Sequence, residues 1–353
     1  MTNFLVGSTI SPEDALPSAF EWRWNAWSTV LGALVWIACL AEAVWGRKQL
    51  GPAECLFLLA PLVTIPFGLR LVTNTHGQGI ARPLLRLTLI FQPLGALLAA
   101  ASFGFPPGRW AGALVAGWLG VTACIGLCGL VGIIQGSTPL LERACLNLGL
   151  VYISFGGFWL VASRLGFHPA GFQEPIVFLT AVHFHYAAFA SPLLAAITGI
   201  ALREASGARP KLFPAAALSV MAAPALLAAG WALGSPLFKV VAALVLAVGL
   251  LLVVGLTLRV IPHFRNALAG ALLVLSGLSV IAGMGLVCVY AGGEFIGAKL
   301  ISIPQMTASH GILNSLGFTL CGLLAWRVER IDQPIHSAPQ GNPCGAAKRA
   351  AGR

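Results

Sequence analysis

The chain has 353 residues, of which 58% are hydrophobic and only 9% charged, and its formal net charge is +10. A soluble domain needs about a quarter of its residues charged to solvate its surface, so this composition excludes a soluble globular protein. The basic residues stand singly between apolar runs, which excludes a phosphate-binding surface and predicts no nucleic-acid partner. We therefore expect an all-α, polytopic transmembrane helical bundle in a lipid bilayer.

Ten apolar runs, each long enough to cross a bilayer as a helix, follow one another along the chain. Hydropathy places them at 27–46, 53–73, 84–105, 110–135, 139–164, 174–202, 212–233, 237–258, 266–291 and 301–326. The transmembrane domain is thus expected to cover residues 27–326. Residues 1–26 lack the apolar core of a cleavable signal peptide and are expected to form a cytoplasmic or interfacial segment. Residues 327–353 gain Pro, Gly and Lys/Arg and are predicted to be a disordered, basic cytoplasmic tail.

The distribution of Lys and Arg predicts the orientation. The loops and ends on the side of the N-terminus hold 15 of these residues, and the opposite side holds 6. Because basic residues are retained on the cytoplasmic side, both termini are expected in the cytoplasm. The eight cysteines include no CxxC pair, and we expect no disulfide framework. In the fourth span, Gly126, Gly129 and Gly132 recur every three residues, which favours close packing against another helix.

Two spans carry polar side chains far from their ends. The sixth contains His183, His185 and Tyr186, about ten residues or 15 Å from its start, and the tenth contains His310 and Asn314 at a similar distance. Ionisable groups in hydrocarbon cost several kcal/mol, so they mark candidate functional sites. Both spans run in the same direction, and the imidazoles are therefore expected at one depth near the middle of the membrane.

His183 and His185 are two residues apart, which places them about 200° apart on a regular helix. We expect one of them to face His310 and the other to take a partner on an adjacent helix. In the alternative interpretation all three histidines are structural and join helices through hydrogen bonds. Glu174 precedes His183 on the same helix and is the carboxylate that can serve this site. Other glutamates at the outer ends of spans, such as Glu294, favour an interfacial position.

Three functions are compatible with this polar site, and its catalytic candidates are His183, His185, His310, Tyr186, Asn314 and Glu174. The first is an intramembrane acid–base enzyme of cyclase or isomerase type that acts on a lipid-soluble small molecule, because imidazole exchanges protons near neutral pH. The second is a proton-coupled small-solute transporter. The third is a metal- or haem-binding protein that uses the three imidazoles as ligands. The sequence identifies no cofactor, and HExxH, GxSxG and Walker motifs are absent.

Three phrases of the sequence carry a family resemblance. They are His183-Phe-His185-Tyr186 with the residues up to Leu194, the second-span run Leu59–Leu71, and His310-Gly311-x-x-Asn314-x-x-Gly317-Phe318. Together they resemble the YndJ-like family of bacterial polytopic membrane proteins, over nearly all the spans. The resemblance implies a multi-pass protein of the bacterial cytoplasmic membrane. It implies no particular reaction.

Overall fold

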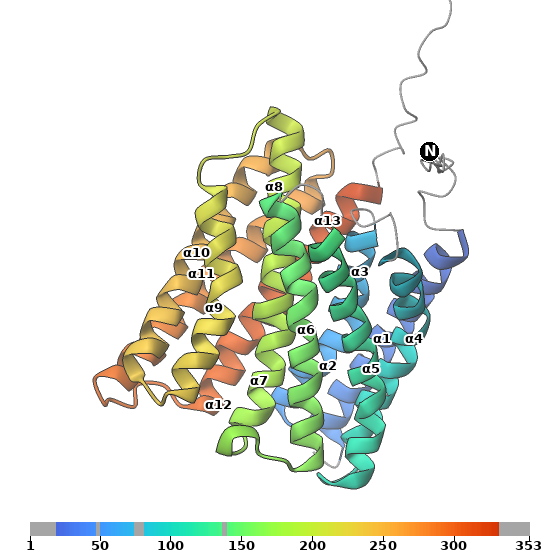
Figure 1. Cartoon of the computed structure of the whole chain (residues 1–353), viewed down its shortest axis with the longest axis vertical. Helices are drawn as coiled ribbons and strands as arrows, with labels where there is room; N and C mark the ends of the chain where they lie inside the picture. Colours follow the sequence, from blue (N-terminus) through green and yellow to red (C-terminus); the bar gives the residue numbers. More distant parts are fainter. Residues whose placement is uncertain (1–18, 47–49, 74–80, 136–139, 332–353) are drawn as a thin grey trace, which may run out of the picture.

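The computed structural model describes residues 19–46, 50–73, 81–135 and 140–331. Within these ranges the chain consists of helices joined by loops and contains no β-strand (Figure 1). The helical elements are α1 (Ala19–Trp45), α2 (Pro52–Leu59), η2 (Ala60–Thr64), α3 (Ile65–Thr73), α4 (Ala81–Ser102), α5 (Arg109–Gln135), α6 (Leu141–Leu165), η3 (Pro169–Gly171), α7 (Ile176–His185), η4 (Tyr186–Ala190), α8 (Ser191–Ser206), α9 (Phe213–Ala232), α10 (Pro236–Val260), η5 (Ile261–His263), α11 (Ala267–Phe295), α12 (Ile303–Met306), η6 (Thr307–Gly311), η7 (Leu313–Leu320) and α13 (Cys321–Ile331).

Ten helices or runs of joined helices in the described ranges are long and apolar enough to cross a membrane. The predicted all-α bundle is therefore confirmed, and the chain is an integral membrane protein. The predicted bounds agree closely; the largest difference is at the end of the eighth span, predicted at residue 258 and observed at His263. Helix α13 continues to Ile331. Most of the predicted N-terminal segment and of the predicted tail lies outside the described residues.

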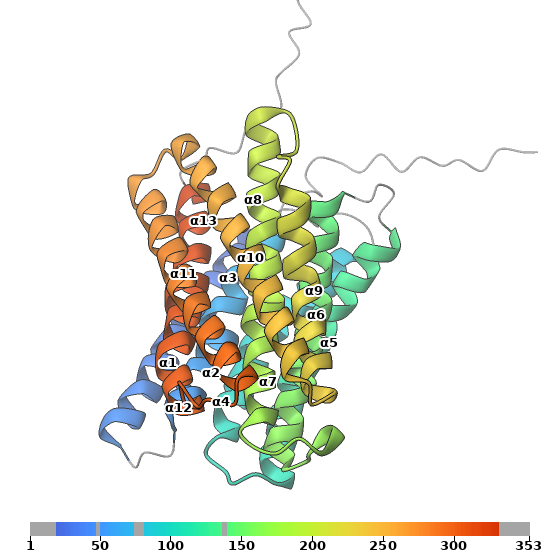
Figure 2. The ribbon, with the colours of Figure 1, turned by 90° about the vertical axis from the view of Figure 1, so that its left-hand side faces the viewer.

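The second and sixth spans form the centre of the bundle. The second span consists of α2, η2 and α3, and the sixth of α7, η4 and α8. In their most apolar windows, 94% and 83% of the residues are buried within the protein, against 11% for the first span. Helix α1 accordingly lies at the periphery, while α9, α10 and α11 form a group on the other side of the centre (Figures 1 and 2).

Both central spans contain a π-helical turn next to a proline. Proline has no N–H group and cannot continue the hydrogen-bond ladder, so a carbonyl is left without its helical donor. Pro61 is the second residue of the turn η2, and Pro192 lies two residues after the end of the turn η4. Side chains of neighbouring helices contact backbone oxygens here: Gln92 Nε2 donates to Pro61 O at 2.7 Å, and Cys145 Sγ to Pro192 O at 3.3 Å. An interhelical hydrogen bond thus reaches each central span within or just after its irregular turn.

The tenth span is π-helical for most of its first half, in η6 and η7, although neither segment contains a proline. Here, polar side chains of the span itself donate hydrogen bonds to its backbone carbonyls. Ser315 Oγ donates to Gly311 O at 2.7 Å, and Asn314 Nδ2 donates to His310 O at 2.8 Å. Side chains that bond to the carbonyl one turn earlier compete with the backbone ladder and distort the helix.

The two ends of the bundle can be distinguished by the direction of the central spans. We call the end at which α7 and α12 begin the lower end, and the end at which α8 and α13 finish the upper end (Figures 1 and 2). Near the upper end, Arg209 in the loop after α8 holds buried Glu142 on α6 through two hydrogen bonds of 3.0 and 2.9 Å. Hydrogen bonding to this carboxylate raises the pKa of the Arg209 guanidinium.

The glycine row of α5 packs against α6, as predicted. A Cβ atom at Gly129 would lie 2.5 Å from the backbone oxygen of Asn147, and one at Gly132 would lie 2.5 Å from the side-chain oxygen of the same residue. Only a residue without a side chain allows this approach. The seven cysteines that the structure describes form no disulfide, and Cys344 lies outside the described residues.

Candidate functional site

A cavity of about 660 Å³ extends into the bundle from its lower end. The second span and all spans from the fifth to the tenth contribute to its wall, while α1, α4 and α5 do not. Its lining is mostly aliphatic and aromatic, with a few polar groups among them. This volume is in the range of small-molecule sites, about 300–1,000 Å³, and such a lining favours an apolar ligand.

His183 and His310 face each other on the wall of this cavity. Their ring centroids are 6.5 Å apart and the ring planes are inclined by 24°. Each residue is the seventh after the start of its helix, at Ile176 or Ile303, which corresponds to about 10 Å along the axis. The equal depth was predicted, but it is smaller than the expected 15 Å because α7 begins only after Glu174 and Pro175.

The tautomer of neutral His183 follows from its hydrogen bond. Nδ1 lies 2.6 Å from the carbonyl oxygen of Leu179, one turn earlier on α7. A carbonyl oxygen only accepts, so Nδ1 carries the proton and Nε2 has a free lone pair. The side chain of His183 lies about two turns from the start of α7 and is nevertheless exposed, because it borders the cavity. His183 therefore offers a proton acceptor to a ligand in the cavity.

His310 differs because its Nδ1 has two kinds of partner. The carbonyl oxygen of Gly283 on α11 lies 3.1 Å away and accepts from a protonated Nδ1, whereas Nδ2 of Asn314 lies 2.9 Å away and donates to a bare Nδ1. Both tautomers of the ring are thus supported, and Nε2 can be an acceptor or a donor. Asn314, a predicted site residue, contacts the imidazole directly and also lines the cavity.

His185 points away from the cavity and is completely buried. Its Nδ1 donates to Ala181 O at 2.7 Å, and its Nε2 accepts from the indole Nε1 of Trp118 on α5 at 2.9 Å. The ring also makes an edge contact with Phe57, at a centroid distance of 5.0 Å. Both nitrogens of the neutral ring are occupied. The two histidines of the sixth span therefore divide as the helical geometry predicted, but nothing in the sequence identified Trp118 as the partner.

Two other predicted residues hold parts of the backbone in place. Tyr186 lines the cavity, and its hydroxyl donates to the carbonyl of Leu56 at 2.6 Å, which ties the sixth span to the second. Glu174 lies before the start of α7 and accepts a hydrogen bond from the backbone N–H of Phe178 at 3.1 Å. Its side chain does not line the cavity.

An ion pair at the lower end of the cavity was not predicted from the sequence. Lys239 Nζ on α10 lies 2.5 Å from Glu294 Oε1 on α11 and 3.8 Å from the centre of the Trp231 ring. All three side chains line the cavity. Their positions in the sequence could have indicated it. Lys239 lies near the start of one span and Glu294 near the end of the next, so both side chains lie at the same end of the bundle.

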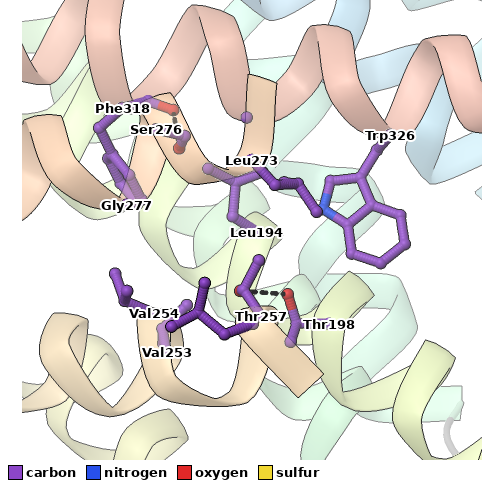
Figure 3. Close-up of a pocket in the computed structure, with 12 residues that line it drawn as sticks. Leu194, Thr198, Val253, Val254, Thr257, Leu273, Ser276, Gly277, Phe318 and Trp326 are labelled. Atoms are coloured by element: carbon purple, nitrogen blue, oxygen red, sulfur yellow. Dashed lines mark hydrogen bonds between the residues drawn. The ribbon is translucent and has the colours of Figure 1, made fainter. Parts of the chain in front are cut away.

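A second, much smaller cavity lies toward the upper end (Figure 3). Its volume of about 20 Å³ accommodates one water molecule. Thr198 and Thr257 face each other there with their hydroxyl oxygens 3.2 Å apart, and Ser276 Oγ donates to Phe318 O at 2.7 Å. Phe318 lines both cavities.

The described residues contain no group of three His, Cys, Asp or Glu side chains placed to hold a metal ion. The predicted ligand set of three imidazoles does not assemble, because the His185 ring lies against Trp118 rather than beside His310. Of the three predicted histidines, only His183 and His310 thus lie together on the cavity wall.

Comparison with known proteins places this architecture among bacterial membrane proteins. A family model described as YndJ-like protein matches residues 55–318, a range that contains every candidate residue discussed above. A curated relative, the uncharacterized membrane protein YndJ of Bacillus subtilis (strain 168), is 26% identical over 300 residues, which are 85% of this chain and 52% of that protein. The chain thus spans about half the length of this relative. No solved structure matches.

Proposed function

We propose that this chain, which belongs to the YndJ-like family of membrane proteins, is an intramembrane acid–base enzyme that acts on a lipid-soluble substrate. The observation that supports this most directly is the facing pair His183 and His310, 6.5 Å apart, on the wall of a largely apolar cavity of about 660 Å³. An apolar wall favours binding of an apolar substrate. Two imidazoles with Nε2 available are suited to move protons on it.

His183 is the base of this proposal. Its Nδ1–H is held by the Leu179 carbonyl, so a proton taken from the substrate arrives at Nε2. The resulting imidazolium keeps its hydrogen bond to Leu179. No ring rotation is needed, and the acceptor is already oriented before the substrate enters.

His310 is the acid. When protonated, it holds its Nδ1–H against the Gly283 carbonyl and gives its Nε2 proton to the substrate. A single proton on the pair is sufficient: His310 protonates one atom of the substrate while His183 removes a proton from another, and the pair ends with one proton as it began. This proton returns from His183 to His310 before the next turnover. Two simultaneous imidazolium charges at this distance would repel each other, which favours the singly protonated pair.

The remaining candidates support this pair rather than touch the reacting atoms. Asn314 donates to His310 Nδ1 in the neutral tautomer in which that nitrogen is bare, and Tyr186 fixes the sixth span against the second. Glu174 accepts from the backbone at the start of α7, and His185 anchors the same helix to Trp118. In this proposal these residues set the position of the two imidazoles.

Deuterium incorporation tests the chemistry while the substrate is still unidentified. Purified full-length protein is incubated with a total lipid extract of the source cells in D2O, and the lipids are searched by mass spectrometry for deuterium bound to carbon. We expect at least one species to gain deuterium, at a rate that falls about 100-fold or more with His183→Ala or His310→Ala. His263→Ala is the matched control, because His263 is exposed and outside the cavity. Absence of incorporation with the wild-type protein, or equal rates in all variants, would refute the proposal.

Proton-coupled transport is the second candidate, and the two cavities favour it. Phe318 borders both cavities. Movement of the Phe318 side chain alone would therefore join them and extend the large cavity from the histidine pair toward the upper end. A transporter releases its solute unchanged. Proteoliposomes that change internal pH on addition of a solute fraction, with no deuterium at carbon, would select this function over the enzyme.

We further propose that the chain resides in the bacterial cytoplasmic membrane with both termini in the cytoplasm. The excess of Lys and Arg on the side of the N-terminus supports this orientation. It places the lower end of the bundle, and the cavity that extends from it, on the outer side of the membrane. Cytoplasmic and periplasmic reporter fusions at each terminus test it; periplasmic activity at either end would contradict it.

A further inference from the structure

The charged part of the large cavity is confined to its lower end. Among the described residues that line it, Lys239 and Glu294 are the only Lys, Arg, Asp or Glu side chains. Their relative exposures are 12% and 32%, so both are partly withdrawn from solvent. Apart from this pair and the two histidines, the described wall carries no side chain that is readily charged near neutral pH.

The site already holds an ammonium group in a defined environment. Lys239 Nζ has a carboxylate oxygen of Glu294 on one side, at 2.5 Å, and the face of the Trp231 ring on another, at 3.8 Å from its centre. A carboxylate together with an indole face suits an ammonium ligand, because the negative face of the ring attracts a desolvated cation. The Lys239 side chain thus occupies a place into which a ligand's ammonium group fits.

The distance to the histidine pair is set by α11. Gly283, whose carbonyl contacts His310, and Glu294 are eleven residues apart on this one helix, which corresponds to about 16 Å. Between them, α11 contributes Met284, Val287, Tyr290 and Ala291 to the wall, and Tyr290 is the one polar side chain among these four. A ligand that reaches both places therefore carries a charged head, a hydrocarbon segment and a reactive group near the imidazoles.

The balance of charge selects the kind of head. An anionic head at Lys239 would bring Glu294 against another negative charge, and a cationic head at Glu294 would leave the Lys239 ammonium partly buried without its partner. A head with one charge of each sign replaces both partners at once. Building on the proposed function, we propose that Lys239, Glu294 and Trp231 form the headgroup subsite for a zwitterionic phospholipid, with its ammonium group at Glu294 and Trp231 and its phosphate at Lys239.

Headgroup preference tests this subsite directly. The full-length protein is placed in nanodiscs containing equal amounts of phosphatidylethanolamine and phosphatidylglycerol with identical acyl chains, and the lipids retained by the protein are quantified by native mass spectrometry. We expect the zwitterionic lipid to be enriched about fivefold among bound lipids, the preference that one cation–π or ionic contact provides. The doubly neutral variant Lys239→Gln/Glu294→Gln is expected to bind both lipids equally. Lys299→Gln, which removes an exposed charge outside the cavity, is expected to behave as the wild type.

A second variant separates ligand binding from a purely structural ion pair. Trp231→Leu leaves both charged residues in place and removes the indole face that the proposal assigns to the ammonium group of the lipid. A preference that came from the two charges alone would survive this change. We expect this variant to lose most of the preference. Equal binding of the two lipids by the wild-type protein, or an unchanged preference in Trp231→Leu, would overturn the proposal, even where the doubly neutral protein fails to fold. The His183→Ala/His310→Ala protein should retain the preference while losing deuterium incorporation, so the subsite and the chemistry fail separately.

Discussion

The hydrogen bond between His185 and Trp118 leads to the most specific prediction about stability. Both residues are 0% exposed, and the indole N–H is the donor that occupies His185 Nε2. Trp118→Phe keeps a buried aromatic ring but leaves this nitrogen without a partner. An unsatisfied buried acceptor costs about 1–3 kcal/mol. For a chain of this size we expect the melting temperature to fall by about 2–6 °C.

The double variant distinguishes the hydrogen bond from simple loss of volume. Replacing both partners by apolar groups is nearly neutral, because no polar atom is then left unpaired. We therefore expect Trp118→Phe/His185→Phe to melt no lower than Trp118→Phe alone, when both are followed by tryptophan fluorescence in the same detergent. His183→Ala, at the cavity wall, is expected to melt within about 1 °C of the wild type, as for substitutions away from core packing. Additive losses in the double variant, or a large loss in His183→Ala, would refute the division into one structural and one functional histidine.

Two further substitutions test how the spans are held together. Tyr186→Phe removes the hydroxyl that donates to Leu56 O at 2.6 Å, and should cost about 1 kcal/mol of stability while leaving headgroup preference unchanged, as measured by thermal melting and lipid binding. Gly317→Ala introduces a Cβ atom that would overlap Ser279 Oγ on α11, and should destabilise by about 1–3 kcal/mol. Gly285→Ala, on the helix that carries Ser279, is its control, since a Cβ there meets nothing within 4 Å, and equal melting of the two variants would contradict the close packing.

The spans and the family could be predicted because their signals are local. A run of apolar residues ends where charge, Pro or Gly begins, and hydrophobicity alone therefore placed the ends of the spans within a few residues of those observed. The phrases around His183 and His310 likewise indicated the YndJ-like family, which the family model confirms.

The chemistry of the site was less accessible, because it depends on contacts between spans. Sequence spacing separates His183 from His185 by about 200°, but it does not say which ring meets Trp118 and which meets the cavity. The support of both His310 tautomers requires Gly283 and Asn314 from two different helices to meet at one nitrogen. The contact of Lys239 with Trp231 likewise depends on how α9 and α10 pack.

The π-helical turn at Tyr186–Ala190 also controls the phase of the sixth span. A turn of this kind contains one residue more than a regular helical turn, so the residues before and after it are offset by about 100° around the axis. His183 can therefore face the cavity while the carbonyl of Pro192, two residues beyond the irregularity, contacts Cys145 on α6. Deleting a single alanine from this segment would restore a regular helix and would turn His183 away from His310, although no residue of the pair had been changed. The length of the segment between the histidines and Pro192 is thus as much a part of the site as the identity of its side chains.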